Sequence, residues 1–214
     1  MVIEMKTLRA TCAAILLLLG GTATHAALFD RGNGLIYDST LNITWLADWN
    51  YAKTSGFHVD GAMDWDTANS WASGLVYGGF DDWRLPSALN ADGSGPCGPA
   101  FDCVESEMGH MIYNNWGATR GQDFFMGSNA ANLALFTNVQ AGPYWFGTEY
   151  APDRDSAWFL YTASTGGFQT YVSKRPPLFA VAVRNGDVPE PQSIALMVAG
   201  LGAVVMVRRR ARLQ

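Results

Sequence analysis

One stretch of the sequence carries the residue types needed for proton transfer. Glu105, Glu107 and His110 lie close together in the chain, and a carboxylate beside an imidazole can act as a general acid–base pair. At helical spacing, such residues more often form a solvated face of a helix than a reacting site. We therefore expect no catalytic residue here, and we keep an uncharacterised surface enzyme as a further alternative.

Two acidic pairs offer the oxygen ligands that calcium prefers. They are Asp64 with Asp66 and Asp153 with Asp155. Calcium needs six or more oxygen ligands, and neither pair lies in a segment that supplies the others. We predict no metal site and no cofactor, with calcium binding kept as an alternative.

Two cysteines lie close together in the middle of the chain. Cys97 and Cys103 flank residues 98–102, a loop-like stretch that contains glycine and proline. In an exported protein this arrangement most often forms a disulfide. A metal site would need more ligands, and beyond the predicted signal peptide the only histidines are His58 and His110. The spacing therefore predicts a disulfide.

The segment 81–86 combines carboxylates, an indole and a guanidinium. Trp83 could stack on a sugar ring, and Arg84 could pair with Asp81 or Asp82. A structural corner is the stronger interpretation, because Leu85 and Pro86 start a new segment. We expect Trp83 to be buried and the ion pair to hold the corner. The residues of this motif are Asp81, Asp82, Trp83, Arg84, Leu85 and Pro86.

The chain has eight tryptophans, and the sequence separates them into two groups. We expect one group in the core: Trp45, Trp65, Trp71 and Trp145, in addition to Trp83. The other group is available for ligand stacking at the surface: Trp49, Trp116 and Trp158.

Composition and charge exclude several classes of protein. Residues 27–187 contain eight Lys and Arg against 17 Asp and Glu, a net charge of −9. Such an acidic region would repel a phosphate backbone, so we expect no nucleic-acid partner. The sequence has no nucleophile elbow, no zinc-protease motif, no P-loop and no dinucleotide fingerprint. A carboxylate pair for glycoside hydrolysis remains open among the scattered acids.

The first 26 residues have the order of a secretory signal peptide. Lys6 and Arg9 form the basic region, residues 12–19 are mostly apolar, and small residues follow up to Ala26. Thr24 and Ala26 suit signal peptidase, so we place cleavage after Ala26. The apolar run is too short for a permanent membrane anchor.

The C-terminal segment, residues 188–214, is predicted to anchor the chain in a membrane. Its apolar run would be about 21 Å long as a helix, which makes a marginal span of a hydrocarbon core of about 30 Å. The positive-inside rule keeps the basic end in the cytoplasm. The segment consists of Pro189, Glu190 and Pro191, an apolar run from Ile194 through Leu196 to Val207, and the basic residues Arg208, Arg209, Arg210 and Arg212.

This order of Pro-Glu-Pro, weak apolar helix and basic end resembles the PEP-CTERM sorting domain of Gram-negative bacteria. The resemblance covers Val188 to Arg212. It implies an inner-membrane intermediate, cleavage near Pro189-Glu190-Pro191 by an exosortase-type transpeptidase, and a cell-surface or secreted product. Proteins with this signal tend to accompany exopolysaccharide production. The implied partners are signal peptidase, the exosortase and, as an alternative, exopolysaccharide, with only transient membrane contact.

The elements that position these residues alternate between short strands and helices. We expect two strands within 33–46 around a turn at Asp38-Ser39, and further strands at 143–148, 157–163, 167–172 and 178–184. A helix is predicted over 63–76, capped by Asp64 and stopped by Gly78-Gly79, and a second over 106–115. The pattern predicts an α+β domain with a mostly antiparallel sheet and two helices, spanning residues 27–187.

The middle of the chain resembles the Lcl C-terminal-like (DUF1566) family over roughly residues 30–186. The resemblance rests on Gly-Phe-Asp-Asp-Trp-Arg-Leu-Pro-Ser at 79–87, a Trp-Asp-Thr-Ala helix, Pro-Tyr-Trp-Phe-Gly-Thr-Glu at 143–149 and a closing strand at 180–184. Residues 145–147 depart from that family, which has small hydroxyl residues there. The resemblance implies a fold like that of C-type lectins and no particular activity. We thus expect a non-catalytic surface or matrix-associated protein, with a carbohydrate-binding module as the alternative.

Overall fold

The computed structural model describes residues 28–163 and 166–188. The predicted signal peptide, the Pro189-Glu190-Pro191 motif, the apolar run and the arginine-rich end lie outside these residues. Within the described part, no helix is long and apolar enough to cross a membrane.

The first sheet joins the start of the described chain to its end. Its strand order is β1-β2-β3-β9, and every pair is antiparallel. The predicted pair of strands within 33–46 is confirmed as β2 and β3. The strands are β1 (Leu28–Asp30), β2 (Leu35–Asp38), β3 (Ile43–Leu46) and β9 (Val183–Asn185).

The second sheet has the order β4-β8-β5-β6-β7. All its pairs are antiparallel except β5 with β8. The register of β5 against β6 shifts between Trp145 and Glu149, where Gly147 donates its backbone N–H to Pro86 instead. The strands are β4 (Ala62–Met63), β5 (Pro143–Glu149), β6 (Ser156–Tyr161), β7 (Phe168–Ser173) and β8 (Leu178–Phe179).

The expected strand over 178–184 is wrong in one respect. It is interrupted, because β8 belongs to the second sheet and β9 to the first. The connection, residues 180–182, is fully buried. A continuous apolar run therefore does not make a continuous strand when each end pairs with a different sheet.

The predicted helix after Asp64 is confirmed but is shorter than expected. Helix α2 (Trp65–Ser73) begins with the Asp64 carboxylate accepting the N–H of Thr67 at 2.8 Å. It ends at Gly74 rather than at Gly78-Gly79, so that the chain can turn back toward the buried Trp83.

The predicted helix over 106–115 consists of two parts. Ser106 caps α3 (Glu107–Gly109), which continues as the π-helical turn η1 (His110–Asn115). Three short helical pieces were not foreseen from the sequence: α1 (Tyr51–Thr54), η2 (Phe124–Met126) and α4 (Ala130–Leu133).

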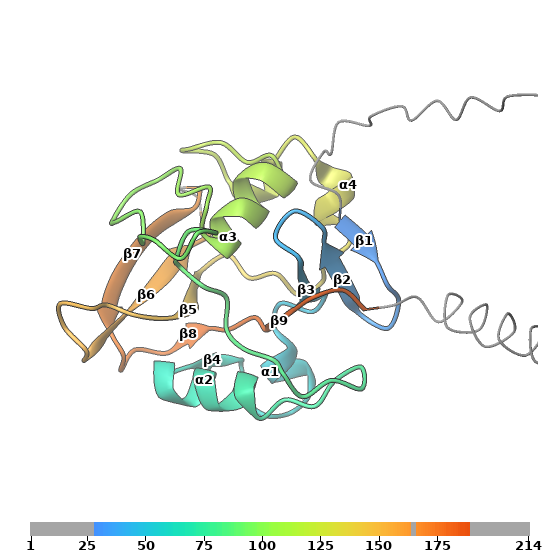
Figure 1. Cartoon of the computed structure of the whole chain (residues 1–214), viewed down its shortest axis with the longest axis horizontal. Helices are drawn as coiled ribbons and strands as arrows, with labels where there is room; N and C mark the ends of the chain where they lie inside the picture. Colours follow the sequence, from blue (N-terminus) through green and yellow to red (C-terminus); the bar gives the residue numbers. More distant parts are fainter. Residues whose placement is uncertain (1–27, 164–165, 189–214) are drawn as a thin grey trace, which may run out of the picture.

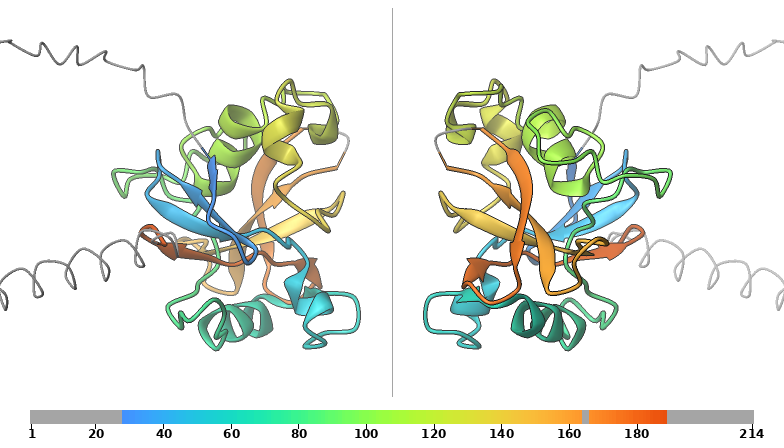
Figure 2. Two further views of the ribbon diagram at one scale, coloured as in Figure 1. Left: turned by 90° about the vertical axis from the view of Figure 1, so that its right-hand side faces the viewer. Right: turned by 90° about the vertical axis from the view of Figure 1, so that its left-hand side faces the viewer.

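Helical elements cover both sides of the second sheet (Figures 1 and 2). One core cluster contains Met108, Met111 and Phe146, so it joins α3 and η1 to the sheet. The other contains Trp71 and Trp145, so it joins α2 to the opposite face. The alternation of inward-facing side chains along β5 thus serves two cores, which confirms a mixed α+β architecture with short helices.

The two ends of the described chain leave from the same side of the molecule, at β1 and β9 (Figure 1). Both strands belong to the first sheet. The predicted export signal and the predicted sorting signal therefore attach to one side of the folded domain.

Candidate functional site

A polar groove runs beside the β2–β3 turn. Two adjoining cavities of about 600 and 460 Å³ share Thr40, Leu41, Ala91 and Glu105 in their walls. The larger cavity is lined mainly by amide, hydroxyl and charged groups, among them Asn42, Ser87, Asn90, Glu107 and Asn185. The larger cavity therefore offers several hydrogen-bonding groups to a polar ligand, beside apolar side chains such as Leu41 and Ile43.

An ion pair forms part of the floor of this groove. Arg84 donates from Nη2 to Glu107 Oε1 at 2.7 Å and from Nη1 to Oε2 at 2.8 Å. The same carboxylate accepts the N–H of Ser87 at 2.7 Å, and Arg84 also donates to Asn185 at 2.7 Å. The predicted pairing of Arg84 with Asp81 or Asp82 is wrong, because Arg84 pairs through its backbone with Val183 and its side chain binds Glu107 of α3.

Asp82 pairs with a different arginine. Arg184 Nε donates to Asp82 Oδ1 at 2.7 Å and Nη2 donates to Oδ2 at 3.0 Å, and its guanidinium lies 3.9 Å from the Phe80 ring centre. Hydrogen bonding from Arg184 holds the pKa of Asp82 below its usual value. Asp81 is solvent-exposed. The segment 81–86 is thus bound to β9 through Asp82 and, among these described residues, it has no ion pair between its own Asp and Arg residues.

Trp83 is buried, as predicted. Its side chain is 2 % exposed, and its indole N–H lies within hydrogen-bonding distance of the carbonyls of Tyr77 and Phe80. Leu85 and Pro86, which follow, are also buried. The motif therefore forms a corner of the fold, with the indole inside and the charged groups bound to other elements.

The structure separates the residues of the predicted acid–base stretch. Glu105 is exposed at the groove, Glu107 pairs with Arg84, and His110 is buried. The nearest carboxylate to His110 is Asp38, whose Oδ2 lies 3.7 Å from Nε2. The other ring nitrogen, Nδ1, is 2.8 Å from the Asn114 side-chain amide.

Asp38 is a buried carboxylate beside His110, and the sequence did not indicate it as a candidate site residue. It is fully buried, and its Oδ1 accepts the N–H groups of Thr40 and Leu41. Burial lowers the pKa of His110 from 6.5, and the Asp38 charge opposes this shift without cancelling it. The Asp38 carboxylate thus holds the β2–β3 turn and also lies beside His110.

The tryptophans expected at the surface are not available for stacking. Trp49 and Trp116 are fully buried and Trp158 is 4 % exposed. Trp49 lies between Trp45 at 5.6 Å and Trp116 at 4.8 Å, measured between ring centres. That prediction is wrong because residues far apart in the chain assemble one aromatic cluster, which no local pattern reveals.

The prediction of core tryptophans is confirmed for three of the four positions. Trp45, Trp71 and Trp145 are buried. Trp65 is only partly buried: its indole N–H donates to the carbonyl of Phe146 at 2.8 Å, and Lys174 lies over its ring at 4.1 Å.

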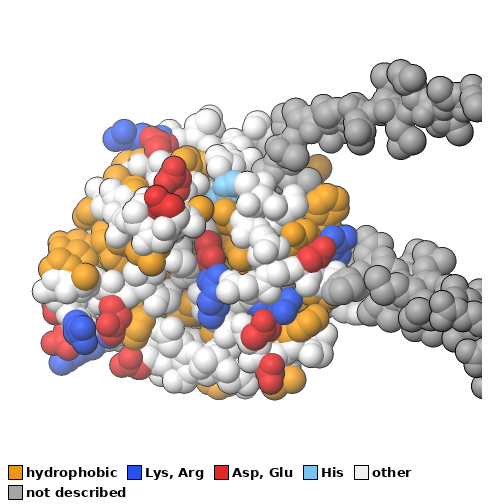
Figure 3. Space-filling model, viewed as in Figure 1, with side chains coloured by type: hydrophobic (Ala, Val, Ile, Leu, Met, Phe, Trp, Pro, Cys, Tyr) orange, Lys and Arg blue, Asp and Glu red, His pale blue; other side chains and the backbone are white. Residues whose placement is uncertain are grey.

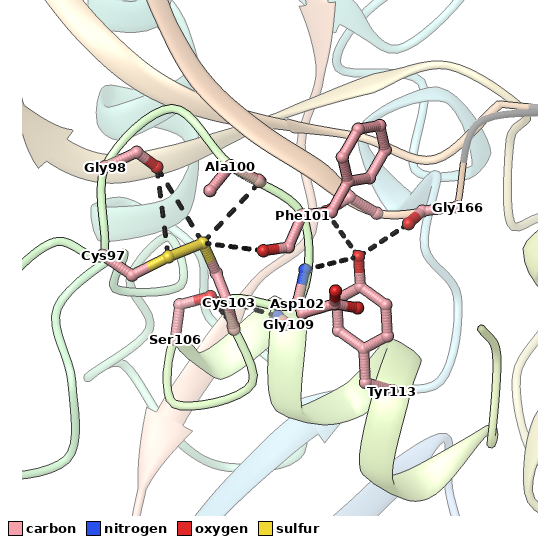
Figure 4. Close-up of a disulfide and its surroundings, with 11 residues drawn as sticks. Cys97, Gly98, Ala100, Phe101, Asp102, Cys103, Ser106, Gly109, Tyr113 and Gly166 are labelled. Carbon is pink, nitrogen blue, oxygen red and sulfur yellow. Dashed lines mark hydrogen bonds between the residues drawn. A yellow bond between two sulfur atoms is a disulfide. The ribbon is translucent and has the colours of Figure 1, made fainter. Parts of the chain in front are cut away.

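The predicted disulfide is present between Cys97 and Cys103, whose Cα atoms are 5.8 Å apart (Figure 4). Tyr113 fixes the end of its loop, since its hydroxyl accepts the N–H of Asp102 at 3.1 Å and donates to the carbonyl of Gly166 at 2.6 Å. Ala100 exchanges two backbone hydrogen bonds with Gln169. The disulfide loop thus extends the edge of β7.

The acidic pairs considered for calcium are engaged in local hydrogen bonds. Asp64 caps α2, and Asp153 accepts from the N–H of Asp155 and the hydroxyl of Ser156. In residues 28–163 and 166–188, no group of three or more His, Cys, Asp or Glu side chains is arranged to hold a metal ion. Calcium binding stays untested.

Charged side chains on the face shown in Figure 3 lie in small clusters of mixed sign, without a broad basic area. The C-terminal end follows this pattern. Arg31 donates from Nε to Asp187 Oδ1 at 2.8 Å and from Nη2 to Oδ2 at 2.6 Å. Val188, the last described residue, is 9 % exposed and belongs to the α2-side core.

A comparison with protein families finds the PEP-CTERM protein-sorting motif at residues 187–211. No curated protein and no solved structure matches the chain. The predicted resemblance of the tail is confirmed, and with it the conclusion that this is an exported protein processed by an exosortase. The match supplies no evidence for the Lcl C-terminal-like family.

Proposed function

We propose that this exported, exosortase-processed protein is a non-catalytic surface or matrix-associated protein of the cell envelope. The observation that carries the proposal is the position of the sorting motif, which begins at the last residues of the folded domain. The sorting enzyme therefore delivers the predicted domain, residues 27–187, as one folded unit, and its disulfide suits an oxidising exterior.

The polar groups of the groove support a non-catalytic role. Glu107 accepts three hydrogen bonds from Arg84 and the Ser87 N–H. A carboxylate bound in this way is held in place, whereas a general acid or nucleophile must face a substrate. His110, the other candidate, is turned toward Asp38.

Intact-mass measurement of the exported protein tests the processing and its consequence. Cells with the sorting enzyme should yield a protein that lacks the residues after the Pro-Glu-Pro motif, and cells without it should retain the tail in the membrane. A surface-associated protein that keeps residues 192–214 in both strains would contradict the proposal. Absence of turnover on a panel of polysaccharides would agree with the non-catalytic role, and turnover would contradict it.

Glycan binding is the second candidate, and the groove favours it. Amide and hydroxyl groups from Asn42, Asn90 and Ser87 line a cavity of about 600 Å³, and such groups are suited to hydrogen bonding with sugar hydroxyls. The ligand would be a polyhydroxylated chain without negative charge, because Arg84 is paired with Glu107 and the exposed Glu105 would repel an anion.

In this second test, a glycan array compares three variants with the native protein. Glu105→Gln and Asn90→Ala change groups that line the groove, and Asp66→Asn is a control that removes an exposed carboxylate elsewhere. Weaker binding by the groove variants with unchanged binding by Asp66→Asn would support a groove ligand. Equal binding by all would exclude the groove.

Distant membership of the Lcl C-terminal-like family, with a C-type-lectin-like fold, remains part of the proposal. Its support is the motif corner, where Trp83 is buried and Asp82 is bound to Arg184 of β9. This motif therefore has a structural role, because it connects its segment to the last strand and fills part of the core.

A further inference from the structure

The folded domain and the sorting motif overlap at two residues. The motif covers residues 187–211, while the structure describes the chain up to Val188. Asp187 and Val188 therefore belong both to the fold and to the segment that the sorting enzyme recognises.

The Asp187 carboxylate is held by Arg31. Arg31, from the β1–β2 turn, binds both carboxylate oxygens of Asp187, at 2.8 and 2.6 Å. Arg31 itself lies against the Phe29 and Tyr37 rings, with its guanidinium about 5 Å from each ring centre. These ring contacts hold Arg31 on the first sheet, in a position to bind Asp187.

The neighbours of Asp187 are also fixed. Gly186 donates its N–H to the carbonyl of Asn42 at 2.8 Å, and Val188 donates its N–H to Asp187 Oδ1 at 2.7 Å. The Val188 side chain is buried in the core cluster that includes Trp83 and Leu85. We call the Arg31–Asp187 ion pair together with the buried Val188 the C-terminal latch.

The latch lies close in sequence to the motif on which the sorting enzyme acts. Pro189, Glu190 and Pro191 follow Val188 directly in the sequence. A transpeptidase that breaks a bond of this motif therefore acts within three residues of the latch.

Peptide-cleaving enzymes bind several residues on both sides of the bond that they break. They bind these residues as an extended chain, because hydrogen bonds to the substrate backbone supply affinity. For a bond near Pro189-Glu190-Pro191, the preceding residues are Asp187 and Val188. With the latch closed, the N–H of Val188 and the carboxylate of Asp187 are already bonded within the domain.

We infer that the folded domain and the transpeptidase compete for Asp187 and Val188, so that opening of the C-terminal latch controls the rate of processing. This inference rests on the processing described under the proposed function. Transpeptidation breaks one peptide bond of the motif: the new carbonyl end passes through the enzyme to an acceptor amine or to water, and the tail leaves with a free amine.

The test is a pulse-chase of the full chain in cells that contain the sorting enzyme. Arg31→Gln opens the latch without changing residues 187–211, and Arg175→Gln is the control because it removes an exposed positive charge elsewhere. When opening is fast, cleavage follows the open population. An ion pair of this exposure predicts conversion about three- to fivefold faster for Arg31→Gln, and no change for Arg175→Gln.

Hydrogen exchange of the purified proteins separates latch opening from general destabilisation. Arg31→Gln should raise exchange at residues 183–188 and leave β6 and β7 unchanged. The inference would be overturned if Arg31→Gln exchanged faster at residues 183–188 but was not converted faster than the native chain. Slower conversion of Arg31→Gln, or unchanged exchange at these residues, would also overturn it. If the native chain is not converted at all, the processing itself is refuted, whereas equal conversion of native and Arg31→Gln chains refutes the latch alone.

Discussion

Asp38 and Asn115, which are 77 positions apart, are joined inside the protein by a hydrogen bond of 2.7 Å from the Asn115 amide to Asp38 Oδ2. Both residues are fully buried. The π-helical turn η1 places His110 and Asn115 beside the same carboxylate, since residues five apart face the same way in such a turn. The bond connects the β2–β3 turn of the first sheet to the helical layer.

Asp38→Asn should destabilise the protein by about 2–3 kcal/mol, because a buried acceptor would become an amide facing the Asn115 amide. Urea unfolding of the mature protein measures this loss. Asp92→Asn is the matched control: Asp92 also accepts an N–H two residues ahead, from Ser94, but it is exposed. A loss at Asp38 no larger than the loss at Asp92 would contradict the role of the buried bond.

His110 should make stability depend on pH. Burial lowers its folded-state pKa below 6.5, and the Asp38 charge only partly offsets this. Below pH 6.5 the unfolded chain therefore binds more protons than the folded chain, so this contribution is present above that pH and is lost as the pH falls toward the folded pKa. Between about pH 7.5 and pH 5.5, the free energy of unfolding should fall more steeply for the native protein than for His110→Gln. Parallel profiles would show that His110 does not titrate in this way.

Trp49→Ala should cost about 3–5 kcal/mol, the range for removing a buried aromatic side chain. Trp49 is in ring contact with Trp45, Trp116, Phe136 and Tyr144. Thermal unfolding measures the effect, and Val76→Ala, at a position that is 75 % exposed, serves as the control. A Trp49→Ala protein of native stability would show that the ring lies at the surface.

Removal of the disulfide should lower stability by about 2 kcal/mol, as expected for closure of a short loop. The Cys97→Ser/Cys103→Ser double variant should melt at a lower temperature than the oxidised protein, and a reductant should shift only the native protein. Exchange of the Gln169 N–H should rise, because Ala100 of the same loop accepts its hydrogen bond. Identical melting of native and double-variant proteins would mean that the loop is held by other contacts.

Sequence reasoning succeeded where the signal is local. Asp64 caps the helix that follows it, and Cys97 and Cys103 pair across a short loop. The hairpin within residues 33–46 was also predictable, although its turn occupies residues 39–42 and Asp38 belongs to β2. Each of these features depends on residues a few positions apart. Sequence reasoning failed for the partner of Arg84, which is Glu107 rather than Asp81 or Asp82.

By itself, the sequence determined that the chain carries a sorting signal at residues 187–211, because such a signal is read by another protein as a linear string of residues. It also determined the mixed α+β class through local periodicity. Only the tertiary structure decided which tryptophans are buried, that Asp38 lies beside His110, and that Arg31 binds Asp187. Burial and charge pairing depend on which distant segments meet, and here the pairing of β9 with β3 brings the last described strand back to the first sheet.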